Sequence, residues 1–274
     1  MDKYTTSHGN KSNFVILFLT FMNPHVYLLI ASLFQQFALA CVLKGHQDWV
    51  RSLDFSQAVM DGDKKAIYLA SSGQDKFIRI WKVSPKIHGD ETGANDGSKG
   101  QSFSIKMYIE GPIFKVGSNL WQASVESVLI GHDDWVYSVQ WQPSRLEWTE
   151  NSAGMQAKIV QPMSILSASM DRTMMIWRPD VTADLWVNDV TVGELGHTAL
   201  GFYGGSWSQS GDAILAHSFG GSFHLWKNVG QQISNWQPQL VPSGHSNSVS
   251  DVAWAKNGHF LLSTSHDQVE QVLL

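Results

Sequence analysis

Cysteine and positive charge are both scarce in this sequence of 274 residues. Cys41 is the single cysteine, which excludes an internal disulfide and is typical of a chain from a reducing compartment. The 19 Lys and Arg residues are outnumbered by 24 Asp and Glu, giving a formal net charge of −5. Because there is no basic excess to form a nucleic-acid surface, we predict no direct nucleic-acid binding.

Spacings typical of metal and phosphate sites are also missing. The 11 histidines contain no His-x-x-x-His pair, and a lone cysteine cannot form Cys-x-x-Cys. The glycine-rich stretch 201–205 is not followed by the Gly-Lys-Ser/Thr of a phosphate loop, and we expect it to give the backbone room where a strand begins. We therefore expect neither a metal nor a cofactor.

Charged side chains are absent between Lys11 and Lys44, where two apolar runs, 14–22 and 26–34, flank an Asn-Pro pair. We interpret residues 1–40 as a hydrophobic, helical segment outside the main domain of residues 41–274. Two alternatives stay open for residues 14–36. They form a membrane anchor or secretory signal, or they are a segment that is poorly ordered or packs on the main domain.

The rest of the chain is dominated by a pattern that recurs four times. Gly-His pairs begin at residues 45, 131, 196 and 244, and each precedes stretches with the alternating apolar and polar residues of β-strands. In the first two copies an aspartate in a turn is followed six positions later by tryptophan, as from Asp75 to Trp81 and from Asp171 to Trp177. Such recurrence predicts a repeat architecture of β-strands.

Two insertions interrupt the repeats, at 84–127 and 143–162. The first contains a polar loop and an alternating run over 103–109, which we expect to be an outer strand followed by a second loop. The second lies between the first and second strands of its repeat. The fourth repeat is cut short, with Leu273 at the position expected for tryptophan.

The Gly-His, Ser, Asp and Trp positions resemble the blades of WD-repeat β-propellers. This resemblance implies an all-β fold, a partial propeller of about four blades with the last truncated. It also implies one hydrogen-bonded chain of four side chains in each blade, in which every buried donor meets an acceptor. The complete sets are His46, Ser71, Asp75 and Trp81, and His132, Ser167, Asp171 and Trp177; the degenerate blades keep His197 and Trp226, and His245, Ser263 and Asp267.

A closer resemblance, over about residues 43–268, is to the family of Elongator subunit 2. It is carried by the stretches 131–136, 164–177, 190–208 and 213–226. This resemblance implies a non-catalytic scaffold in the cytoplasm and nucleus. Its partners would be the largest subunit and the catalytic acetyltransferase subunit of a complex that modifies wobble uridines in tRNA, bound on the propeller faces or on the two insertions. The hydrophobic start and the residues after 268 differ from that family, and four blades are too few to close a ring.

An alternative function is a membrane-anchored or secreted propeller, either a binding protein or an enzyme, that uses residues 14–36. The histidine, aspartate and serine of each repeat are also the residue types of a serine-hydrolase triad. A triad occurs once and needs an exposed nucleophile, whereas this set is copied in consecutive repeats. We therefore predict that no residue of the chain is catalytic.

Overall fold

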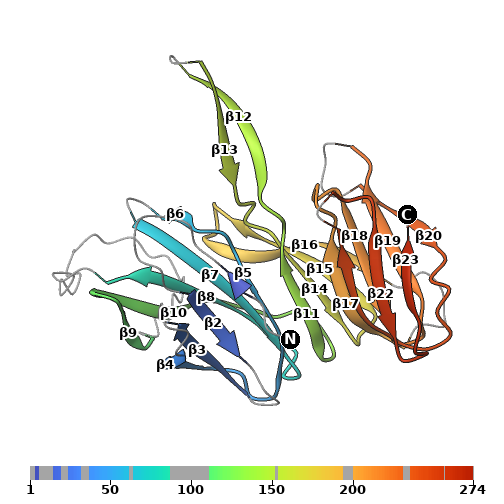
Figure 1. Ribbon diagram of the computed structural model, residues 1–274, viewed down its shortest axis with the longest axis horizontal. Coiled ribbons are helices and arrows are strands. Elements are labelled where there is room, and N and C mark those ends of the chain that lie inside the picture. Colours follow the sequence, from blue (N-terminus) through green and yellow to red (C-terminus); the bar gives the residue numbers. More distant parts are fainter. Residues whose placement is uncertain are drawn as a thin grey trace.

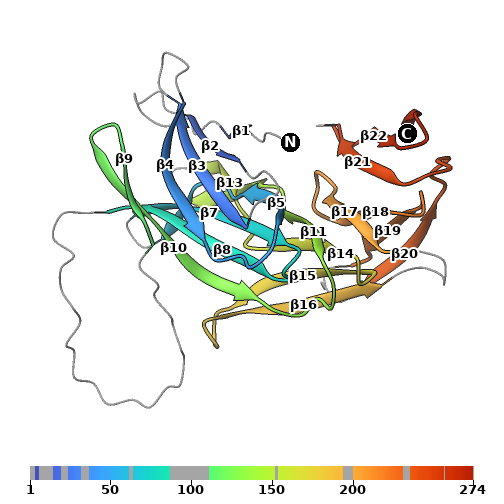
Figure 2. The ribbon, with the colours of Figure 1, turned by 90° about the horizontal axis from the view of Figure 1, so that it is seen from below.

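The fold is known from a computed structural model that describes residues 4–5, 15–19, 24–31, 37–61, 64–86, 111–151, 154–193, 200–230, 235–255 and 257–273. Every secondary-structure element assigned in this part of the chain is a β-strand, β1 to β23. They form five successive antiparallel sheets that follow one another around an open arc, plus one projecting hairpin (Figures 1 and 2). The all-β partial propeller expected from the sequence is confirmed.

The first sheet overturns the expectation of a helical N-terminal segment. It is built in the order β1 (Tyr4–Thr5), β2 (Val15–Leu19), β3 (His25–Ala31) and β4 (Phe37–Lys44). Val26 and Leu28 on β3 are fully buried and pack against residues of the second sheet. The apolar runs on both sides of the Asn-Pro pair are each short enough for a strand, and a short apolar run buried in a sheet has the same composition as a buried helix. No helix among the described residues is long and apolar enough to span a bilayer.

The second sheet has the order β5-β7-β8-β10-β9, with β6 paired to β7. Its strands are β5 (Val50–Phe55), β6 (Val59–Asp61), β7 (Lys64–Gly73), β8 (Ile78–Pro85), β9 (Ile113–Val116) and β10 (Asn119–Leu129). The expected loop before Ser127 is therefore wrong, because β9 and β10 occupy it and β10 pairs with β8 as the outer strand. The run 103–109 lies outside the described residues.

The third sheet contains β11 (Val136–Trp141), β14 (Ile165–Ser169), β15 (Thr173–Asp180) and β16 (Leu185–Gly193), in that order. The second insertion leaves this sheet between β11 and β14 as a hairpin of β12 (Arg145–Asn151) and β13 (Gly154–Val160). The hairpin projects from the arc (Figure 1).

The fourth sheet has the same plan, with β17 (Phe202–Trp207), β18 (Ala213–Ser218), β19 (Phe223–Asn228) and β20 (Trp236–Val241). The fifth consists of β21 (Val249–Trp254), β22 (Leu261–Ser265) and β23 (Glu270–Leu273). The first sheet thus adds one unit to the four counted from the repeats.

A hydrophobic core lies between each pair of neighbouring sheets. On β14, Ile165 belongs to the core shared with the second sheet, whereas Leu166 and Ala168 belong to the core shared with the fourth. Successive side chains of a strand point to opposite faces, so a strand with both faces covered buries all its residues. Each sheet is therefore stabilised mainly by its neighbours, as in other repeat folds.

The first strands of neighbouring sheets are also tied by hydrogen bonds. The backbone N–H of Trp141 donates to the Asp54 carboxylate at 2.7 Å, and its indole N–H donates to the Asp54 carbonyl at 3.2 Å. Trp207 makes the same pair of bonds to Gln140, at 2.8 and 3.3 Å. These bonds fix how the first strand of one sheet is positioned, along its length, against the first strand of the next sheet.

Candidate functional site

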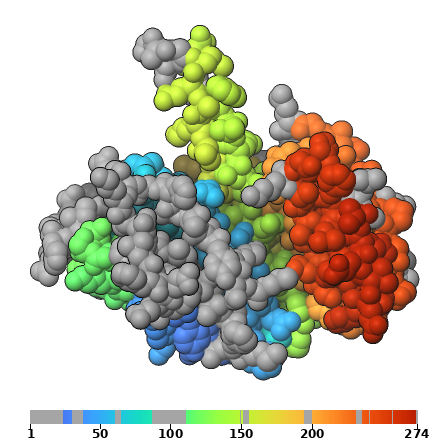
Figure 3. Space-filling view, viewed as in Figure 1, coloured from blue at the N-terminus to red at the C-terminus, as the bar shows by residue number. Residues whose placement is uncertain are grey.

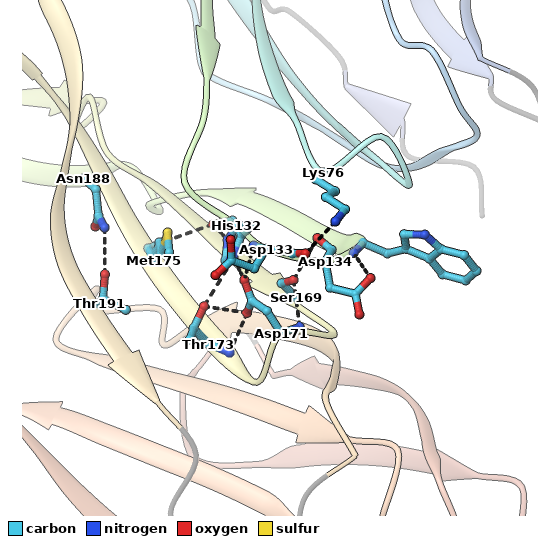
Figure 4. Close-up of polar contacts among 12 residues, drawn as sticks. Lys76, His132, Asp133, Asp134, Ser169, Asp171, Thr173, Met175, Asn188 and Thr191 are labelled. Atoms are coloured by element: carbon cyan, nitrogen blue, oxygen red, sulfur yellow. Dashed lines mark hydrogen bonds and ion pairs between the residues drawn. The ribbon is translucent and has the colours of Figure 1, made fainter.

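The third sheet brings together all four residues predicted to form a chain. The Nδ1 atom of His132 lies 2.7 Å from a carboxylate oxygen of Asp171, and its Nε2 atom lies 2.7 Å from the Ser167 hydroxyl. The indole N–H of Trp177 donates to the same hydroxyl at 2.8 Å. Figure 4 shows His132 and Asp171 facing each other, with Thr173 beside them.

The strand register explains why these residues meet. Residues 131 and 132 lie just before β11, Ser167 is in the middle of β14, and Asp171 occupies the turn between β14 and β15. Trp177 pairs with Ile165 across the β14–β15 ladder. Gly131 leaves room for the indole, because a Cβ atom there would lie 2.9 Å from Cη2 of Trp177.

The polar groups of this set are satisfied by one another. Nδ1 of His132 contacts Asp171, Nε2 contacts the Ser167 hydroxyl, and the indole N–H of Trp177 donates to the same hydroxyl, which also donates to the Met175 carbonyl at 3.4 Å. The hydroxyl is fully buried and both of its main hydrogen-bonding positions are filled. A buried, occupied hydroxyl cannot meet a substrate, so the arrangement holds strands together and is unsuited to nucleophilic catalysis.

The second sheet contains the same hydrogen-bonded set of four side chains, with Arg79 as a fifth member. His46 contacts Asp75 at 2.9 Å and Ser71 at 2.8 Å, and Trp81 donates to Ser71 at 2.9 Å. Arg79, a residue that the sequence motif does not include, donates from Nη1 to the second oxygen of Asp75 at 2.9 Å. Arg79 is buried, and no repeated pattern pointed to it, because Met175 stands at the equivalent position in the third sheet.

The fifth sheet keeps three of the four members. His245 lies 3.0 Å from Asp267 and 2.8 Å from Ser263. Leu273 pairs with Leu261, which is the register that Trp177 and Trp81 have in their sheets. Leucine in place of tryptophan at residue 273 therefore removes the indole donor from this hydrogen-bonded set and leaves the contacts of His245 in place.

The fourth sheet departs from the pattern, as its sequence indicates. His197 lies outside the described residues, and Trp226 is buried opposite Ile214. A different chain is present, in which the hydroxyls of Ser218 and Ser222 lie 2.7 Å apart and Ser222 lies 2.9 Å from Nε2 of His224. The imidazole of His224 stacks on Trp226. Sequence reasoning missed this network because none of its members occupies a motif position.

Burial and hydrogen bonding set the charges of these residues. Burial favours the neutral form of Asp171, but hydrogen bonds from His132, Thr173 and the backbone N–H of Asp133 outweigh it and lower the pKa to about 2. For His46, burial lowers the pKa against the opposing effect of Asp75. The second sheet thus holds a neutral imidazole beside a carboxylate.

No group of three or more potential metal ligands gathers anywhere in the described ranges. Gly204 and Gly205 serve packing between neighbouring elements, because a Cβ at Gly204 would lie 2.2 Å from Nε2 of His217. The space expected at 201–205 is thus occupied by neighbouring side chains, His217 beside Gly204 and Met174 beside Gly205.

Comparison with known proteins agrees with this geometry. The WD domain, G-beta repeat family matches residues 37–82, 123–178 and 236–269. Proteins named Elongator complex protein 2 are similar to the chain: the one from Arabidopsis thaliana is 52% identical over 241 residues, which is 86% of this chain. Those from Danio rerio and Homo sapiens are each 36% identical, over 90% and 86% of this chain.

The chain spans about a quarter of the length of these relatives, 27% for the Arabidopsis thaliana and Danio rerio proteins and 26% for the human one. Each matched segment contains the His, Ser and Asp of one hydrogen-bonded set and begins on the outer strand of the preceding sheet. The chain therefore belongs to the WD-repeat family, and the relatives that it resembles over most of its own length are named Elongator complex protein 2.

Proposed function

We propose that the chain is a non-catalytic WD-repeat scaffold of the Elongator complex. Its partners would be the largest subunit and the catalytic acetyltransferase subunit of this complex, which modifies wobble uridines in tRNA. The similarity to Elongator complex protein 2 from several organisms is the observation that carries the proposal.

The buried His–Ser–Asp–Trp chains support a binding role over catalysis. In the second and third sheets, the polar groups that a hydrolase would use are hydrogen-bonded to one another and hold the strands together, at about 1 kcal/mol net per hydrogen bond. What such a framework offers to other molecules is its outer surface. On this proposal the chain works in the cytoplasm and nucleus, with the rest of the complex.

Co-purification tests the proposal. The tagged chain is expressed with the catalytic acetyltransferase subunit and the largest subunit, and a full-length Elongator complex protein 2 serves as positive control. We expect the chain to recover at least one of the two subunits. Recovery by the full-length control alone would reject the scaffold role for this chain.

A further inference from the structure

The first strands of the second to fifth sheets share a β-bulge near their start. The pairing register of β5, β11, β17 and β21 shifts at the same place, which leaves one extra residue in each strand: Arg51, Tyr137, Tyr203 and Ser250. A bulge bends the strand and re-aims the side chain of its extra residue. These strands line the inside of the arc (Figure 2), so three large side chains stand at equivalent points of neighbouring inner strands.

These three side chains and two further rings form one continuous row. The guanidinium carbon of Arg51 lies 4.4 Å from the centre of the Tyr137 ring, which meets Tyr203 edge to face at 5.1 Å. Tyr203 in turn stacks on Phe219 at 5.2 Å, and Trp135 lies beside Tyr137 at 6.3 Å. The second, third and fourth sheets thus contribute to a single aromatic row with a cation over one of its rings, called here the inner row.

The inner row is accessible to solvent. Trp135 and Phe219 are each 41% exposed, Arg51 is exposed and the two tyrosines are half-buried. None of the five belongs to a hydrophobic core between sheets. Burial and the neighbouring Tyr137 raise the pKa of Tyr203 against the opposing effect of Arg51, so the Tyr203 phenol stays protonated and remains a hydrogen-bond donor.

Arg51 has donors to spare for a ligand. Its guanidinium is restrained by the Tyr137 ring, yet its N–H groups have no hydrogen-bond or ion-pair partner among the described residues. An arginine held in this way recognises a carboxylate through two parallel N–H bonds, and little further freedom is lost when those bonds form. The row therefore presents a preorganised carboxylate binder next to exposed aromatic rings.

The neighbouring loops favour a peptide over a nucleic acid. Asp48, Asp133 and Asp134 are exposed there, and the carboxylates of Asp48 and Asp134 each accept the backbone N–H of the tryptophan that follows, at 2.7 Å. A phosphate backbone carries a negative charge at every nucleotide and is repelled by these aspartates. A peptide with one carboxylate at Arg51 and apolar side chains on the rings avoids that repulsion.

We propose that the inner row binds an acidic segment of a partner protein. An aspartate or glutamate of the segment pairs with the Arg51 guanidinium, and an apolar or aromatic side chain next to it packs on Trp135 and Phe219. Tryptophan, tyrosine and arginine are the residue types that carry most binding energy at protein interfaces. The site stands on the contacts of the inner strands and does not require an Elongator subunit as the partner.

Selection from a display library of short random peptides, with the full chain immobilised, tests this assignment. We expect the enriched peptides to hold Asp or Glu close to an aromatic residue, and replacing that acid by its amide to weaken binding at least about ten-fold. Arg51→Met should weaken the same peptides to a similar degree. Arg145→Met is the matched control, expected within about two-fold of wild type, because it removes the same charge from the β12–β13 hairpin, which stands clear of the sheets (Figure 3).

Charge reversal distinguishes lost recognition from lost folding. Arg51→Glu should lose the acidic peptides and bind versions in which lysine replaces the acid, a rescue that a misfolded chain cannot give. No enrichment, enrichment without acidic residues, or equal binding by Arg51→Met and wild type would overturn the proposal, as would binding of single-stranded oligouridylate that Arg51→Met abolishes. None of these measurements contains an Elongator subunit, so their failure is distinct from a failed co-purification.

Discussion

At the scale of single residues, the buried serine hydroxyl of each His–Ser–Asp–Trp set, here called a tetrad, joins side chains from different elements of one sheet. Ser167 accepts the indole N–H of Trp177 and contacts Nε2 of His132, whose Nδ1 in turn contacts Asp171. A hydrogen-bonded chain of this kind is costly to interrupt, because every member left behind is buried without its partner.

Asp171→Ala tests this coupling. The substitution leaves Nδ1 of His132 and the backbone N–H of Asp133 without their acceptor, and we expect a loss of about 1 to 3 kcal/mol in the free energy of unfolding. Urea denaturation followed by tryptophan fluorescence measures the change. Asp133→Ala, an exposed neighbour, is the matched control and should cost less than about 0.5 kcal/mol. Equal effects of the two substitutions would show that the hydrogen bonds among His132, Ser167, Asp171 and Trp177 contribute nothing to stability.

The Asp171 carboxylate also makes the free energy of unfolding depend on pH in the acidic range. The pKa of Asp171 is about 2 in the folded chain against 3.8 for an unperturbed aspartate. A lowered folded-state pKa stabilises the fold above the unfolded pKa, and this contribution is lost as pH falls from about 4 to about 2. We expect about 1 to 2 kcal/mol to disappear in that window. Subtracting the stability of Asp171→Asn from that of wild type at each pH isolates the effect, and a difference that stays constant between pH 5 and 2 would contradict it.

The sequence was sufficient for the tetrads and insufficient for their surroundings. Ser167, Asp171 and Trp177 have the same spacings as Ser71, Asp75 and Trp81, and a Gly-His pair precedes each set, so the pattern alone identifies them. Arg79 and the Ser218–Ser222–His224 chain occur once each, and a contact that is not repeated leaves no pattern in a single sequence. Their partners became known only from the strand register.

At the scale of elements, the bonds that link the first strands of neighbouring sheets do not continue to the fifth sheet. Asp54 accepts from Trp141 and Gln140 accepts from Trp207, but the next residue in this series is Ser206, whose side chain is too short for the same span. The indole nitrogen of Trp254, at the corresponding place in β21, is buried without a hydrogen-bond partner. Among the described residues no such pair of bonds joins the fourth and fifth sheets, where Nδ1 of the buried His217 instead lies 2.9 Å from the carbonyl oxygen of Val249.

Ser206→Gln should supply the missing side-chain acceptor. We expect its amide oxygen to accept the backbone N–H of Trp254, as that of Gln140 does for Trp207, and to raise the free energy of unfolding by about 0.5 to 1.5 kcal/mol. Ser206→Ala, which adds no acceptor, is the control and should bring no gain. Thermal denaturation followed by circular dichroism measures both variants. A Ser206→Gln protein no more stable than the alanine variant would show that the two strands are not in register for this bond.

The apolar N-terminal elements show where a sequence pattern is ambiguous. β3 and β4 are strands with few charges, and their composition is equally compatible with a helix. What decides the outcome is the neighbouring sheet, because Leu43 and Val26 complete a core with Leu69 and Trp81. A tertiary partner of this kind cannot be recognised from the composition of the segment itself.

At the scale of the whole molecule, stability follows the order of the sheets around the arc. The third sheet is covered on both sides, and all five residues of β14 are buried. In the fifth sheet only Leu261 and Ser263 of β22 are buried, since one face of this strand meets no other sheet within the described residues. Repeat proteins gain stability from each pair of neighbours, so a unit with one neighbour opens at a lower free energy than a unit with two.

Native-state hydrogen exchange measures this difference directly. Leu166 and Leu262 occupy equivalent second strands, each paired on both sides within its sheet, so their amides differ mainly in the packing of the sheet. We expect the amide of Leu262 to exchange at least about 100-fold faster than that of Leu166, which corresponds to about 2.7 kcal/mol of additional packing in the third sheet. Added denaturant should accelerate exchange at Leu166 more steeply than at Leu262, because opening the third sheet exposes more surface. Exchange of both amides at one free energy and with one denaturant dependence would mean that the arc unfolds as a single cooperative unit, and that coupling along the sheets outweighs the loss of a neighbour at the fifth.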